Sequence, residues 1–140
     1  MSISKECKNL YFAQNNNLNN IYQKMLYINY NKYKKNDHWI WWVFPTTKVG
    51  NNDIYKSGIT NIDDMIYILN KKNTMVIWVN ILIYLSKCLK SQKTKLIFPK
   101  NDHNRINIFF DEWIKEYKNL KKYKDFYNAF KLFYIEWYSI

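Results

Sequence analysis

The run MVIWVNILIYL, residues 75–85, is the longest apolar segment of the sequence, and it decides the expected fold class. Within and just beyond it, apolar side chains recur at the three- and four-residue spacing of one helix face: Met75, Trp78, Val79, Leu82, Leu85 and Leu89. The run is roughly half as long as a bilayer-spanning helix, and Asn80 lies in its middle. We therefore predict a buried helix at the centre of a core, and no membrane segment.

Helical patterns flank this segment on both sides, and clean strand alternation is missing. We expect further helices over about residues 18–33, 60–69, 106–117 and 123–138. Asn15 to Asn20 is predicted to be a turn, and Thr60 and Thr74 are predicted N-caps. The stretch from Thr46 to Gly58 holds both glycines and is the expected long loop. We predict a mainly α fold, in which residues 1–140 form a compact single-domain helical bundle of about five to six helices.

Composition supports a packed core and leaves the meaning of the charge open. Hydrophobic residues make up 48% and aromatic residues 19% of the chain, which disordered chains do not reach. The net charge is +11, from 22 basic and 11 acidic residues, and this favours an anionic partner. However, the excess of Lys, Asn, Ile and Tyr is typical of an A/T-rich genome, such as that of a large DNA virus, so many lysines are equally explained as solvated surface residues.

Several chemistries are not expected. Cys7 and Cys88 lie far apart and outside any metal-ligand spacing, so we predict no metal site, no disulfide framework and a reducing, cytoplasmic location. The start of the chain lacks the pattern of a signal peptide. Glycine-rich phosphate loops, GxSxG and HExxH are missing, and no cofactor is predicted.

The stretch HWIWWVFP, residues 38–45, is the main functional candidate. Any helix that holds its tryptophans should end before Pro45, because proline restricts the residue that precedes it. In a helix Trp39 and Trp42 share a face and Trp41 lies about 160° away from Trp39, so one face cannot bury all three. The tryptophans either fill gaps between helices or stack on a planar ligand.

Polar residues near this stretch and near residue 100 are the other candidates. His38 follows Asp37, and an imidazole beside a carboxylate can exchange protons near neutral pH, so His38 is the one candidate catalytic residue if the protein is an enzyme. Asp102, His103 and Arg105 form a polar group at an expected helix start. Arg105 is the only arginine, and it would hold either a phosphate or carboxylate ligand or a structural carboxylate.

The same residues resemble a family catalogued as domain of unknown function 1810, some members of which carry the label calpastatin. The resemblance spans about Phe12 to Trp113. Its matched positions are Ala13-Gln14, His38 to Pro45, Tyr55, Ile59, Tyr67, Leu69, Ile97-Phe98 and Asp102. The chain departs from the family in a shorter loop after Pro45, in Ile108-Phe109 where serines are usual, and in Arg105 for lysine. The resemblance implies a compact, mainly helical fold and no established activity, and nothing in this sequence supports calpain inhibition.

The residues favour a binding module over an enzyme. The predicted ligand is small and anionic, such as a nucleotide, a cyclic nucleotide, or an NAD or ADP-ribose derivative, which the protein would sequester. The candidate ligand-binding residues are His38, Trp39, Trp41, Tyr55, Asp102 and Arg105. Two alternatives remain: a basic domain that binds an acidic protein or RNA through Lys115 to Lys131, with the tryptophans as core, and a weak hydrolase of a nucleotide-derived ligand.

Overall fold

The computed structural model describes residues 2–140, and throughout that range the regular structure is helical, with no strand. The elements in chain order are α1 (Lys5–Leu26), α2 (Ile40–Val43), α3 (Ile62–Leu69), α4 (Lys72–Gln92), the 3-10 turn η1 (Lys95–Ile97), α5 (Lys100–Ile114), α6 (Tyr117–Leu120) and α7 (Lys124–Tyr138). The predicted mainly α fold is confirmed. The described residues form seven α-helices where five to six were expected, because α2 and α6 are single turns.

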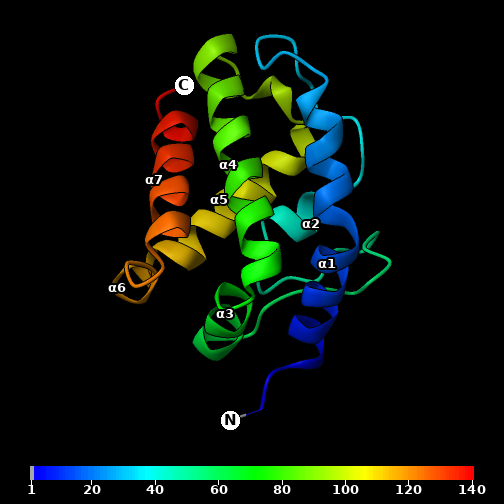
Figure 1. Cartoon of the computed structure of the whole chain (residues 1–140), viewed down its shortest axis with the longest axis vertical. Coiled ribbons are helices and arrows are strands. Elements are labelled where there is room, and N and C mark those ends of the chain that lie inside the picture. Colours follow the sequence, from blue (N-terminus) through cyan, green and yellow to red (C-terminus); the bar gives the residue numbers. More distant parts are fainter. Residues whose placement is uncertain (1) are drawn as a thin grey trace.

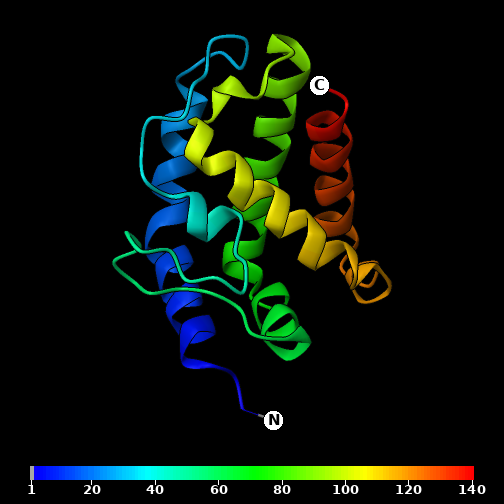
Figure 2. The same cartoon turned by 180° about the vertical axis from the view of Figure 1, so that it is seen from behind.

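Helices α1, α4 and α7 lie side by side along the long axis of the molecule, and all three run in the same direction (Figure 1). Helix α5 returns the chain between α4 and α7 by crossing them diagonally, as Figure 2 shows. The middle helix, α4, packs against both α1 and α7. Of the helices in residues 2–140, α4 alone is long and apolar enough to cross a membrane by length and composition. In this fold its Trp78, Leu82, Leu85 and Leu89 are buried, so its central position in the core is as predicted.

Helix α1 differs from the prediction in both of its boundaries. It begins after Ser4, whose hydroxyl accepts the backbone N–H of Cys7 at 3.1 Å, and it ends at Leu26 instead of continuing to residue 33. The asparagine run lies inside the helix, so the predicted turn is wrong. Asn16 and Asn17 donate their side-chain amides to carbonyls one turn earlier, each at 2.7 Å. These bonds and a buried stripe that includes Leu18 keep the segment helical despite its low helix propensity.

Both predicted threonine caps are corrected. The side chain of Asn61 caps α3 by accepting the N–H of Asp64 at 3.1 Å, while Thr60 donates to the Asp64 carboxylate instead. Thr74 lies within α4 and donates its hydroxyl to the carbonyl of Lys71. Asp64 in the first turn of α3 is fully buried, and four N–H and O–H donors from Ser4 and Thr60 take the place of water around its carboxylate.

The backbone of Trp42 to Pro45 holds the helices together. As predicted, the helix that carries the tryptophans stops before Pro45, with Val43 as its last residue. Each of the four carbonyls then accepts a side-chain N–H from another helix: Trp42 from Gln14 (2.9 Å), Val43 from Trp78 (2.9 Å), Phe44 from Arg105 (3.2 Å) and Pro45 from Trp113 (2.9 Å). These donors come from α1, α4 and α5, so this short segment fixes the relative positions of three helices.

Candidate functional site

A surface pocket of about 370 Å³ lies between the start of α2, the long loop and the first turns of α5. We call it the α2–α5 pocket. Four of the six candidate residues line it: His38, Trp41, Asp102 and Arg105. Lys48 and the amide side chains of Asn51, Asn52, Asn101 and Asn104 complete its polar lining. The pocket therefore combines one indole ring with cationic and amide side chains. That these residues bind a ligand stays a prediction.

Trp41 is the tryptophan of this stretch that reaches the surface. Trp39 and Trp42 are buried, with 3% and 8% of their surface exposed, whereas Trp41 is only partly buried. Its ring lies 6.0 Å from the ring of Trp42. Gly50 in the long loop passes so close to the Trp41 indole that a Cβ at residue 50 would collide with the ring. The loop thus holds Trp41 at the edge of the pocket through a glycine that no side chain can replace without movement.

His38 lies on the exposed rim of the pocket, without an oriented carboxylate. The neighbouring Asp37 pairs with Lys24 at 3.6 Å instead. The hydrogen bonds found among residues 2–140 leave the His38 ring without a protein partner. His38 is therefore free to turn toward a ligand, and the structure does not supply the fixed acid–base pair that the hydrolase alternative would use.

Arg105 fastens the long loop to α5. Its Nε donates to the carbonyl of Phe44 and its Nη1 to the carbonyl of Lys48, so the expected structural carboxylate is replaced by backbone oxygens. The second terminal nitrogen, Nη2, is buried and finds no hydrogen-bond partner within residues 2–140. Burial lowers the pKa of Arg105 to about 10, against the opposing effect of Asp53 and Glu112. The guanidinium stays charged at neutral pH, and the N–H donors of its Nη2 have no protein partner among the described residues.

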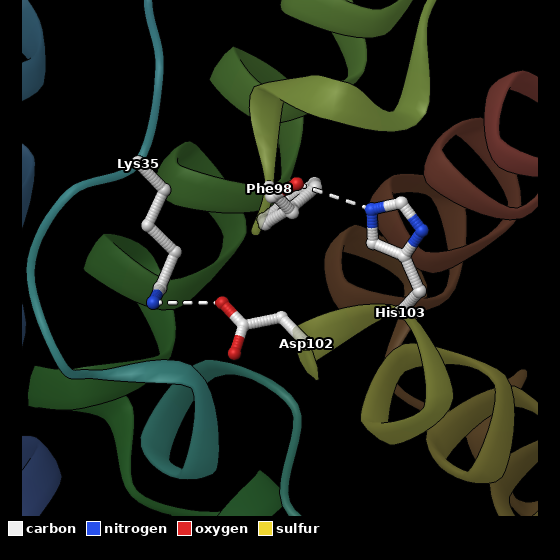
Figure 3. Close-up of polar contacts among 4 residues, drawn as sticks. All are labelled: Lys35, Phe98, Asp102 and His103. Carbon is white, nitrogen blue, oxygen red and sulfur yellow. Dashed lines mark hydrogen bonds and ion pairs between the residues drawn. The ribbon is translucent and has the colours of Figure 1, made fainter. Parts of the chain in front are cut away.

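Lys35 does not line the pocket but pairs with Asp102, which does, and the sequence did not reveal this contact. Its ammonium is buried and lies 2.8 Å from Oδ2 of Asp102, as Figure 3 shows. The same ammonium lies 5.0 Å from the ring centre of Trp39. His103 points away from this pair and contacts the carbonyl of Phe98 at 3.1 Å (Figure 3). The predicted group of Asp102, His103 and Arg105 therefore separates into three different roles, and only sequence-distant contacts identify Lys35.

Trp39 and Tyr55 are not brought into the α2–α5 pocket. Trp39 lies beneath Lys35 and lines a different hollow beside Met25 and Tyr33. Tyr55 packs edge-on against Trp42, with ring centres 5.3 Å apart, and its hydroxyl accepts the side-chain amide of Asn17. Both residues support the backbone around the pocket and have no surface in it.

The long loop is organised by Asp53, a role that the sequence pattern does not reveal. The carboxylate is fully buried and accepts the indole N–H of Trp42 at 3.2 Å and the backbone N–H groups of Tyr55 and Ser57 at 3.0 and 2.9 Å. The hydroxyl of Ser57 also donates to it. Asp53 in a glycine- and asparagine-rich loop is a usual turn residue. Its four donors make it the residue that holds the pocket wall in place.

The two thiols are not candidate nucleophiles. Cys7 and Cys88 are both buried and free. Burial raises the pKa of each thiol to about 12, so both stay protonated at neutral pH. The described residues also contain no cluster of three or more histidine, cysteine or acidic side chains arranged to hold a metal ion.

No protein-family model matches the chain, and neither a curated protein nor a solved structure matches it. The resemblance to domain of unknown function 1810 therefore stays a prediction. The residues on which it rests divide by role. Gln14 and Trp42 belong to the hydrogen bonds described above, whereas His38 and Trp41 line the pocket.

Proposed function

We propose that the α2–α5 pocket binds a small anionic ligand with a planar ring, such as a mononucleotide, and sequesters it. The observation that carries this proposal is the convergence of His38, Trp41, Asp102 and Arg105, distant in sequence, on one pocket. Its volume of about 370 Å³ lies near the lower end of the range for small-molecule sites, about 300–1,000 Å³, which favours a single nucleotide over a dinucleotide.

Each part of the pocket suits one part of such a ligand. The partly exposed indole of Trp41 offers a face on which a base can stack. Lys48 and the charged guanidinium of Arg105, which line the pocket, supply positive charge for a phosphate. The asparagine amides and the carboxylate of Asp102 can pair with the polar edge of a base. Because His38 has no carboxylate to orient it, the arrangement favours binding over acid–base turnover.

Tryptophan fluorescence tests this proposal directly, since five of the six tryptophans are buried and Trp41 is not. The protein is titrated with AMP, cyclic AMP, ADP-ribose and NAD while emission and melting temperature are followed. We expect saturable quenching and a raised melting temperature with at least one compound. Trp41→Phe should remove the quenching signal, and Lys48→Ala should weaken binding by about ten-fold. Lys118→Ala, an exposed lysine on α6, is the matched control and should leave binding unchanged.

Two results would contradict the proposal. One is that none of the four compounds changes either the tryptophan emission or the melting temperature. The other is an equal effect of Lys48→Ala and Lys118→Ala, which would indicate general charge attraction. In either case, the exposed lysines of α6 and α7 become the next surface to test for an acidic protein or RNA.

A further inference from the structure

The last residue of α1 and the turn that follows it carry unusually exposed apolar side chains. Residues Leu26, Tyr27, Ile28 and Tyr30 have 55%, 89%, 41% and 45% of their surface exposed. In both views of the molecule the turn lies at the same end as the C-terminal ends of α4 and α7 (Figures 1 and 2). This end lies apart from the α2–α5 pocket, with which it shares no residue. We call it the α1–α4 end.

Side chains of α4 fix the backbone of this turn through three hydrogen bonds. The hydroxyl of Tyr84 on α4 donates to the carbonyl of Ile28 at 2.6 Å. The amide of Gln92, also on α4, donates to the carbonyls of Tyr30 and Tyr33, both at 2.9 Å. Aromatic side chains on a held backbone lose little conformational entropy when they bind a partner.

Positive charge surrounds these rings. Lys32 and Lys34 follow them in the turn, and Lys87 and Lys90 are exposed on the last turns of α4. The side chains of Tyr30, Lys87, Lys90 and Ser91 line one open hollow of about 320 Å³. Asp37, the acidic residue of this connection, is already paired with Lys24. The α1–α4 end therefore offers two ammonium groups and two hydroxyls in one place, beside exposed aromatic faces.

We propose that the α1–α4 end binds single-stranded nucleic acid. Bases stack on the rings of Tyr27 and Tyr30, and a backbone phosphate lies in the hollow between Lys87 and Lys90. Stacking on aromatic rings combined with lysine contacts to phosphate is the usual means of binding single strands without sequence preference. Asn29 and Asn31 occupy the same turn, and burial of their amides in a lipid bilayer would be costly, whereas the edges of bases can pair with them.

Fluorescence anisotropy with labelled oligo(U) and oligo(dT) of about 12 nucleotides tests the proposal, since single-strand sites span roughly 4–16 nucleotides. We expect binding that weakens steeply between about 50 and 200 mM salt, and weaker binding of a duplex of equal length. Tyr27→Ala should weaken binding about ten-fold, because stacking is lost. Lys87→Ala with Lys90→Ala should weaken it and also reduce the salt dependence. Melting temperatures of all variants show that the fold is kept.

Two matched controls lie elsewhere on the surface. Phe12→Ala removes an aromatic ring that is 60% exposed on the middle of α1, and Lys118→Ala with Lys122→Ala removes two exposed lysines at α6. Both should bind the oligonucleotides as well as the natural chain does. Equal losses in the controls, no oligonucleotide binding, or binding only to anionic lipid vesicles with the same dependence on Tyr27 would each overturn the proposal.

Discussion

A backbone carbonyl removed from water needs a hydrogen-bond donor, and the carbonyls of Trp42 to Pro45 obtain theirs from side chains on three helices. The dense run of aromatic residues excludes water around these carbonyls. The indole N–H groups of Trp78 and Trp113 then replace it. At this scale the stretch is mainly structural, and His38 and Trp41 are its surface-facing members.

Gln14 provides the first prediction. Gln14→Ala should lower the free energy of unfolding by about 1–3 kcal/mol, because it leaves the buried carbonyl of Trp42 without a donor. Gln23→Ala removes the same side chain from the exposed face of the same helix and should change stability by less than about 0.5 kcal/mol. Urea unfolding measures both. Equal values for the two variants would show that the contact contributes no stability.

Gly50 provides the second prediction. Gly50→Ala should displace Trp41, since the added Cβ overlaps the indole ring, and should lower the free energy of unfolding by about 1–3 kcal/mol. Acrylamide quenching of Trp41 should increase as the ring moves into solvent. Asn51→Ala, at the exposed neighbouring position, is the control and should leave quenching unchanged. Unchanged quenching in Gly50→Ala would mean that the loop shifts and the ring does not.

The sequence predicts some of these residue roles and cannot predict others. The division between a surface-facing Trp41 and the buried Trp39 and Trp42 agrees with helical geometry, because Trp39 and Trp42 share a helix face and Trp41 lies on another. The burial of Lys35 could not be predicted in this way, because its partner Asp102 is distant in sequence and only the tertiary fold brings the two together. Trp39 is predicted in the site because it is next to His38 in the sequence, but adjacency in sequence does not determine which way the ring points.

At the scale of elements, Asp64 ties the start of α1 to α3. Its carboxylate accepts the backbone N–H and hydroxyl of Ser4 at 3.1 and 2.6 Å, and those of Thr60 at 2.8 Å each. Burial alone raises the pKa of this carboxyl, but the hydrogen bonds from Ser4 and Thr60 outweigh it, and the pKa lies below its usual value. The ionised form therefore stabilises the folded state.

Asp64→Asn tests this link. A carboxyl with a lowered pKa contributes its full stability above the pKa of the unfolded chain, about 3.9, and loses it as the pH falls through the folded pKa. The natural chain should exceed Asp64→Asn in free energy of unfolding by a constant amount above about pH 5, and the difference should shrink below about pH 4. Urea unfolding at several pH values measures it. Asp63→Asn, its less buried neighbour, should show no such trend, and a parallel trend would assign the effect to net charge.

The elements also show how far the sequence pattern reaches. Helix α4 was predicted well because its apolar repeat is unbroken and one face is buried along its length. Helix α1 was misplaced because asparagine usually marks a turn, and its side chains here bond to the preceding turn of the helix. The predicted cap at Thr60 is wrong because the Thr60 hydroxyl donates to the carboxylate of Asp64, which is buried and needs donors.

For the whole molecule, aromatic side chains join α4, α5 and α7 in one core. The ring of Phe44 lies 5.2 Å from that of Phe133 on α7 and 5.4 Å from that of Phe109 on α5. Trp78 on α4 lies 4.7 Å from Phe126 on α7 and 5.7 Å from Trp113 on α5. The buried hydrophobic residues of α1, α3 and α2 belong to the same cluster.

A core shared in this way should unfold in one step. Far-UV circular dichroism reports the helices and tryptophan fluorescence reports the core, so the two urea transitions should coincide for a single cooperative unit. Phe133→Ala, which removes a ring at the junction of α2, α5 and α7, should lower the free energy of unfolding by about 3–5 kcal/mol and move both transitions together. A helix signal lost before the fluorescence change, in the natural chain or in Phe133→Ala, would mean that part of the helical structure unfolds before the core and would contradict a single cooperative unit.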